Sequence, residues 1–263
     1  TGARPMSDRR LRRRLVVPSG WPSAVVVALL VGLGGRSLLV HLGSPAVADR
    51  WLVVALPVLV YQVGFLAYQQ VDLGLAGDVS FALRLPTLVT MVRGNLYAVT
   101  SGFVLVTPET PLIAWIPGVC YGLGAALDYV DGQLARHLGN PTELGARLDH
   151  AFDTLGFLVA PLVGVVWGRL PAVYLSISAA RYLFRAGIWW RRRRDLPVAP
   201  LPPSRYRRLL AGLQMAFITV ALLPVVPPDL VHPVAIVVMS PSLAIFGRDY
   251  LHVTGRIAGE DEE

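Results

Sequence analysis

The sequence predicts an all-α integral membrane protein with about eight transmembrane helices. Of its 263 residues, 54% are hydrophobic and only 16% are charged, whereas water-soluble domains carry about 25% charged residues. The mean hydropathy is +0.55, and long apolar stretches recur along nearly the whole chain. Because backbone polar groups must be satisfied internally within a bilayer, helices are the expected spanning elements for stretches of this length.

Short connections rich in proline or polar residues separate the apolar stretches, each of which approaches the ~20 residues that a helix needs to cross the hydrocarbon. The predicted spans lie near 22–42, 51–70, 86–106, 111–134, 146–168, 171–190, 208–226 and 230–248. The first stretch is too long for a signal peptide and no clear cleavage site follows it, so we expect a retained first helix. Residues 72–85 are too polar to span and are expected to lie on the membrane surface.

The arginine clusters predict the orientation of the chain. They lie at 9–14, 191–194 and 205–208, each beside an apolar stretch, and cytoplasmic loops of membrane proteins are enriched in such residues. With a cytoplasmic N-terminus, all three clusters fall on that side, and an even number of spans places the C-terminus there too. The formal charge of +7 therefore indicates anchoring at anionic lipid headgroups. No nucleic-acid partner is expected, because the basic residues do not form a separate domain.

Four aspartates lie at or near the ends of two consecutive predicted spans. Asp128 and Asp131 are three residues apart, and Asp149 and Asp153 are four apart, so each pair shares one face of a helix. Gly, Asn and Pro at 139–141 break the helix between the pairs and let the second helix return antiparallel. The two helices are therefore expected to present four carboxylates to one pocket.

Such a cluster of carboxylates would repel itself unless cations were bound. Hard divalent ions, Mg²⁺ or Mn²⁺, are the expected ligands of carboxylate oxygens. Four carboxylates suit two ions about 3.5–4 Å apart, an arrangement that clamps a phosphoryl centre.

Small and basic residues accompany the aspartates. Gly132 and Ala135 fall on or beside the Asp128 face, which leaves room for a bulky ligand near the backbone. Gly145 stands one turn before Asp149 and permits a close helix approach. Arg136 is a fixed cation suited to a phosphate oxygen.

The stretch from Asp128 to Asp153 reads D-x2-D-G-x2-A-R-x8-G-x3-D-x3-D. This pattern resembles the signature of the CDP-alcohol phosphotransferase family at all of its fixed positions. Residues 86–93 also resemble the Pro-Asn-x-x-Thr-x-x-Arg opening of that family's core, with Thr87 in place of asparagine.

The resemblance implies a division of the chain. Residues 80–252 would form a six-helix catalytic membrane core. Residues 1–79 would add a basic N-terminus, two extra transmembrane helices and the interfacial segment. Residues 253–263 would form an acidic cytoplasmic tail.

The resemblance also implies a role for each matched residue. Metal ligands would be Asp128, Asp131, Asp149 and Asp153, with Asp153 also the general base that deprotonates the acceptor. The residues implied to line the nucleotide and pyrophosphate pocket are Gly132, Ala135, Arg136, Gly145 and Thr90. By resemblance alone, Thr87, Thr90 and Arg93 could help hold the nucleotide, and capping and anchoring the end of a span is an equally good interpretation.

The implied reaction is attack of an activated hydroxyl on the phosphorus that bears the lipid or alcohol group, with release of CMP. CDP-diacylglycerol is the expected donor, because membrane lipids are the commonest substrates of the family, and a phospholipid precursor is the expected product. The implied partners are a CDP-alcohol donor, a small hydroxyl acceptor and membrane lipids, at a site that opens to the cytoplasm. Members of the family commonly form homodimers, but no residue here establishes an interface.

Two arginines in the sixth predicted span, Arg181 and Arg185, suggest a pocket for an anionic acceptor such as a phosphorylated polyol. The alternative is that both side chains reach toward the interface and anchor the helix.

Two functions of other classes remain open. Carboxylate pairs within spans also form ion pathways in transporters, but these favour carboxylates near the bilayer centre and related halves of the chain. Here the cluster lies toward the cytoplasmic end and no inverted repeat is visible. A catalytically inactive membrane scaffold is the other alternative, against which the intact motif argues.

Overall fold

The structure, a computed structural model, describes residues 21–75, 85–138, 143–201 and 204–256; for 85–86 and 131–138 it describes the backbone alone. All regular elements in these ranges are helices. In chain order they are α1 (Trp21–Leu42), α2 (Pro45–Asp72), α4 (Leu85–Ser101), η1 (Gly102–Leu105), α5 (Pro111–Leu138), α6 (Glu143–Val166), η2 (Ala172–Tyr174), α7 (Leu175–Arg193), α8 (Arg205–Leu222) and α9 (Pro228–Val253). Most of the predicted interfacial segment lies outside the described residues.

Each predicted span corresponds to one α-helix of the described chain, and the predicted all-α membrane class is confirmed. Within the part of the chain that the structure describes, six helical segments are long and apolar enough to cross a membrane: α1, α2, α4 with η1, the apolar part of α5, α6 and α9. Helices α7 and α8 do not reach this standard, because arginines interrupt the former and begin the latter. The predicted count of eight spans is therefore not confirmed.

Large apolar side chains cover the outer faces of the bundle. On α1, Leu30 and Leu33 are 66% and 64% exposed, and on α9 Val237 is 71% exposed. Contiguous apolar surface of this kind is rare on water-soluble monomers. The outward faces are therefore suited to contact with lipid acyl chains.

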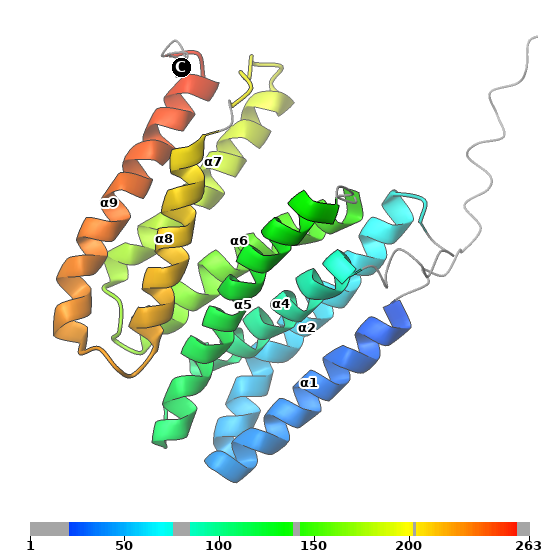
Figure 1. Cartoon of the computed structure of the whole chain (residues 1–263), viewed down its shortest axis with the longest axis vertical. Helices are drawn as coiled ribbons and strands as arrows, with labels where there is room; N and C mark the ends of the chain where they lie inside the picture. Colours follow the sequence, from blue (N-terminus) through cyan, green and yellow to red (C-terminus); the bar gives the residue numbers. More distant parts are fainter. Residues whose placement is uncertain (1–20, 76–84, 139–142, 202–203, 257–263) are drawn as a thin grey trace, which may run out of the picture.

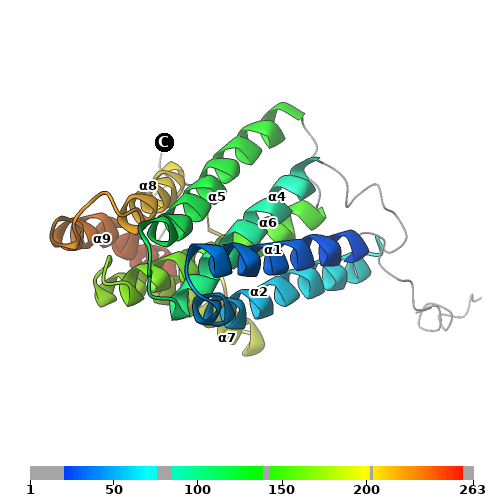
Figure 2. The same cartoon turned by 90° about the horizontal axis from the view of Figure 1, so that it is seen from below.

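The helices pack in an order that puts the aspartate-bearing pair in the middle. Helix α1 packs on α2, α2 on α4, and α4 on both α5 and α6. Helix α8 packs on α5, α6 and α9, and α7 packs on α6 and α9. Figure 1 accordingly shows α1 along one edge of the molecule and α9 along the opposite edge, with α5 and α6 between them. The view from below in Figure 2 shows α1 and α2 running side by side.

Trp51 joins the first two helices to the rest of the bundle. Its side chain is fully buried, and its indole Nε1 donates a hydrogen bond of 2.9 Å to the Val99 carbonyl of α4. The ring lies against Gly35 of α1 and Gly102 of η1, where any side chain would overlap it. Two glycines thus make the space for one tryptophan where α1, α2 and η1 meet.

Candidate active site

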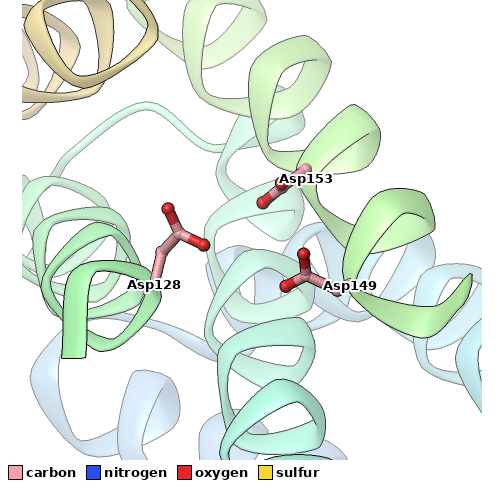
Figure 3. A group of neighbouring side chains, drawn as sticks. All are labelled: Asp128, Asp149 and Asp153. Atoms are coloured by element: carbon pink, nitrogen blue, oxygen red, sulfur yellow. The ribbon is translucent and has the colours of Figure 1, made fainter. Parts of the chain in front are cut away.

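Three of the four predicted aspartates converge between α5 and α6. Asp128 lies on α5, and Asp149 and Asp153 lie one turn apart on α6. Each contributes a carboxylate oxygen, and these oxygens all lie within 4.8 Å of one another. Figure 3 shows Asp128 facing the other two across the gap between the helices. All three side chains are partly buried, so a ligand can approach them from solvent.

Arg93 of α4 lies among these carboxylates. Its side chain is 1% exposed, and its guanidinium forms ion pairs with all three aspartates. Nη1 donates to Asp128 and Nη2 donates to Asp149, while Nη2 lies 3.0 Å from Oδ1 of Asp153. A buried arginine is stable only beside compensating charge. Helix α4 therefore supplies the cation that holds the three carboxylates together.

Tyr97, one turn beyond Arg93 on the same helix, sets the distance between the two aspartate-bearing helices. Its ring is buried and lies between Gly124 of α5 and Gly156 of α6. A Cβ at Gly124 would stand 2.6 Å from the ring's Cε1, and one at Gly156 would stand 2.8 Å from Cε2. Both are shorter than real contacts allow, so a larger residue at either position would force the ring or a helix to move.

The described oxygens fit a divalent cation. Carboxylate oxygens are the preferred ligands of Mg²⁺ and Mn²⁺, and three of them lie close enough to surround one ion. Oδ1 of Asp153 is buried and accepts no hydrogen bond from any described residue, although Arg93 lies nearby. One arginine offsets only part of the charge of three carboxylates. The site therefore retains negative charge and an unsatisfied buried oxygen that a metal ion would satisfy.

The other predicted pocket residues are placed less completely. For Asp131, Gly132, Ala135 and Arg136 the structure describes only the α5 backbone, which continues through them to Leu138. The structure thus does not place the fourth aspartate. Gly145 lies one turn before Asp149 on α6 and is partly buried. Thr90 is buried on α4, one turn before Arg93.

Arg181 and Arg185 line a cavity of about 560 Å³ between α6, α7, α8 and α9. The guanidinium of Arg181 stacks on the Phe157 ring at 4.0 Å. Arg185 donates to Oγ1 of Thr154 at 3.0 Å and contacts Nε2 of His150. Thr154 directly follows Asp153 on α6, so this cavity lies on the side of α6 next to the aspartates, although none of the three lines it. The structure thus brings the two predicted arginines together beside the aspartates.

Sequence reasoning missed two features of this site. It assigned Arg93 either to the nucleotide, by resemblance, or to anchoring the end of a span, and not to the centre of the aspartates. The only available signal was that an arginine inside an apolar stretch needs a charged partner. It also gave Tyr97 no role, because glycines 27 and 59 residues away reveal their contact with this ring only in three dimensions.

Comparison with known proteins decides the family. Residues 83–245 match the family described as CDP-alcohol phosphatidyltransferase. The chain belongs to this family. The match begins just before α4 and ends within α9, so α1 and α2 of this CDP-alcohol phosphatidyltransferase family member precede the matched segment.

Three curated relatives of this family member are provisionally named cardiolipin synthases, one from Mycobacterium bovis and two from strains of Mycobacterium tuberculosis. Each is 29% identical over 120 residues, which is 44% of this chain and 56% of the relative. The matched segment thus spans little more than half the length of these relatives. No solved structure matches the chain.

Proposed function

We propose that this protein transfers a phosphatidyl group from a CDP-activated donor, CDP-diacylglycerol, to a hydroxyl acceptor and releases CMP, as a step of phospholipid biosynthesis. The observation that carries the proposal is the convergence of Asp128, Asp149 and Asp153 around Arg93, within a chain of the matching family. A cavity lined by Arg181 and Arg185 lies beside α6, where Thr154 directly follows Asp153, and could admit an acceptor.

The proposed metal site comprises Asp128, Asp149 and Asp153, with Asp131 as a further ligand by resemblance to the family. Mg²⁺ or Mn²⁺ bound there would neutralise the charge that develops on the pyrophosphate as CMP departs. Arg93 would keep the three carboxylates at their mutual spacing. Gly132, Ala135, Arg136, Gly145 and Thr90 are proposed to line the nucleotide and pyrophosphate pocket.

Asp153 is the proposed general base. A carboxylate has two oxygens, so one oxygen of Asp153 could face the metal and Arg93 while the other accepts the proton of an acceptor hydroxyl. As that proton moves to Asp153, the hydroxyl oxygen attacks the phosphorus of the transferred group. The bond from this phosphorus to the CMP oxygen breaks, and CMP leaves with the electron pair.

The proposed acceptor carries a phosphate close to its hydroxyl. Arg181 and Arg185 would bind that phosphate in the 560 Å³ cavity, with Thr154 and His150 holding Arg185 in place. Two sources of this chemistry fit the cavity: a soluble phosphorylated polyol and the headgroup of a lipid such as phosphatidylglycerol. The apolar part of the lining, including Phe184, Ile188 and Phe246, favours the lipid.

The names of the mycobacterial relatives also favour a lipid as the acceptor. Cardiolipin carries two phosphatidyl groups on one glycerol, so phosphatidyl transfer onto a glycerol headgroup would produce it.

We also propose that the site faces the cytoplasm. Ser178 and Arg185 of α7 bond to Phe157 and Thr154 of α6 respectively, so the two helices run antiparallel. The arginine-rich end of α7 therefore lies toward the same end of the bundle as the aspartates, and positive residues favour the cytoplasmic side.

The test is CMP release by the purified protein with CDP-diacylglycerol, Mg²⁺ or Mn²⁺, and separate acceptors: glycerol 3-phosphate, inositol phosphate and phosphatidylglycerol. Metal-dependent release with one acceptor, lost in Asp153→Asn, would establish both the reaction and the acceptor. If no acceptor supports release, the proposed donor is wrong. If CDP and metal also fail to bind, an ion transporter or an inactive scaffold becomes the better interpretation of this protein.

A further inference from the structure

A second cavity, of about 620 Å³, lies between α2, α6 and α7. Its α2 wall consists of Val58, Tyr61, Phe65 and Gln69 together with Pro57, and the first four follow the helical spacing of one face. Helix α2 precedes the segment that matches the family. This cavity therefore uses a wall that the family core does not provide.

The cavity lies on a different side of α6 from the aspartates. Its α6 lining includes Arg147, Ala151, Thr154 and Leu155, which share one helix face. At 100° per residue, the middle of this face points away from Asp149 and Asp153, and His150, which also lines the cavity, lies at the edge nearer to them. None of the three clustered aspartates lines this cavity.

Three wall residues are shared with the cavity lined by Arg181. Arg185, with His150 and Thr154, lines both cavities. Its described contacts are with these two neutral or weakly basic partners, and it forms no ion pair with any carboxylate among the described residues. By contrast, Arg147 at the outer end is already paired with Asp72 and Glu143, both at 2.7 Å. Among the described residues that line this cavity, Arg185 is therefore the cation without a carboxylate partner.

Polarity changes along the length of the cavity. Gln69 and Arg147 lie near the ends of their helices, whereas Val58, Pro57 and Leu155 lie deeper in the bundle. The α2 wall from Val58 to Gln69 is about 16 Å long at ~1.5 Å per residue. A groove of this length can hold one acyl chain. The cation on its wall can bind the anionic headgroup of the same lipid.

We propose that the α2–α6–α7 cavity binds an anionic phospholipid, with an acyl chain along Val58 and Phe65 and its phosphate at Arg185. Arg185, which also lines the cavity between α6, α7, α8 and α9, would thus bind the phosphate of a bilayer lipid. Both proposals place a phosphate at Arg185, but lipid labelling of α2 and CMP release are separate measurements, so the two proposals can fail separately.

The test uses the full chain in nanodiscs that contain trace phosphatidylglycerol with a photoreactive group at the end of one acyl chain. A phosphatidylcholine analogue with the same chain is the matched probe. After irradiation, labelled peptides are quantified by mass spectrometry. We expect the α2 peptide around Val58 to be labelled about tenfold more by the phosphatidylglycerol probe than by the phosphatidylcholine probe, the ratio given by one charge-assisted contact.

Substitutions test whether the labelled lipid is bound in this cavity. Val58→Trp fills the groove and should remove the labelling of α2. Val53→Trp makes the same change on the same helix at an outward position that is 64% exposed, and should leave it intact. Arg185→Gln should remove the preference for phosphatidylglycerol, and Arg185→Lys should retain part of it. Equal labelling by both lipids, or labelling that persists in Val58→Trp, would overturn the proposal.

Discussion

Arg93 and Asp153 meet in the centre of the bundle: Nη2 of the arginine lies 3.0 Å from Oδ1 of the aspartate. The same guanidinium also pairs with Asp128 and Asp149, so one side chain of α4 joins residues from α5 and α6. This arrangement compensates part of the carboxylate charge before any metal ion binds.

Replacing Arg93 with Met should therefore destabilise the metal-free protein by about 3 kcal/mol, because it leaves three neighbouring carboxylates without their internal cation. Thermal unfolding in detergent with EDTA measures this loss. Adding Mn²⁺ should raise the unfolding temperature of Arg93→Met more than that of the wild type, since the ion then supplies the missing charge. Arg93→Lys retains a positive charge and is the matched control. An equal Mn²⁺ effect in all three proteins would show that Arg93 is not the counterion of this cluster.

Gly156→Ala should reduce CMP release and lower stability by about 1–3 kcal/mol, because its Cβ would press on the Tyr97 ring between the aspartate-bearing helices. Gly247→Ala on α9 is the control, since a Cβ there meets nothing within 4 Å. Kinetics and thermal unfolding of both variants check the prediction. If Gly156→Ala behaves like Gly247→Ala, Tyr97 does not control the separation of α5 and α6.

Arg181→Ala and Arg185→Ala should each raise the KM for the acceptor by about tenfold or more and leave the KM for the donor nearly unchanged, because each removes a charged contact to the acceptor phosphate. Steady-state kinetics with each substrate varied in turn separate the two constants. Arg169→Ala removes an arginine that instead donates to the Val226 carbonyl at 3.2 Å, and should alter neither constant. An unchanged acceptor KM in both cavity variants would refute the assignment.

The proposed orientation predicts opposite labelling of two connections. In a Cys120→Ser background, a cysteine at Asp195 should react with a membrane-impermeant maleimide only when the cytoplasmic face is accessible. A cysteine at Val225, which is 57% exposed in the α8–α9 connection, should react only from the other face. Labelling of both sites from one side would show that α8 does not span the membrane. The experiment therefore decides whether a helix that begins with arginines crosses the bilayer.

Local patterns predicted the helices of this protein well. Apolar stretches gave every described α-helix, because a helix in lipid must carry a continuous apolar surface. They erred mainly at the ends: α2 begins at Pro45 with Ser44 as its N-cap, well before the predicted start, since capping residues belong to the helix but not to its apolar stretch. The number of spans stays open for a different reason. Arginines interrupt α7 and begin α8, and composition alone does not show which of these side chains the bundle shields from lipid.

The site was less completely predictable. The spacing of Asp149 and Asp153 placed both on one helix face, and the structure brings that face toward Asp128. Arg93 could not be assigned, because its partners lie 35 to 60 positions further along the chain. The contact of Tyr97 with two glycines was likewise invisible, since only the packed helices bring the three residues together.

The burial of Trp51 has a consequence for engineering. Its ring occupies space bounded by Gly35 of α1 and Gly102 of η1, and it bonds to α4. A truncated protein that begins at the family-matched segment would expose an apolar surface shaped for an absent indole. Likewise, grafting α1 and α2 onto another member of the family would require a glycine at the position of Gly102 in the recipient. The N-terminal pair is thus a fitted part of this protein and not an exchangeable module.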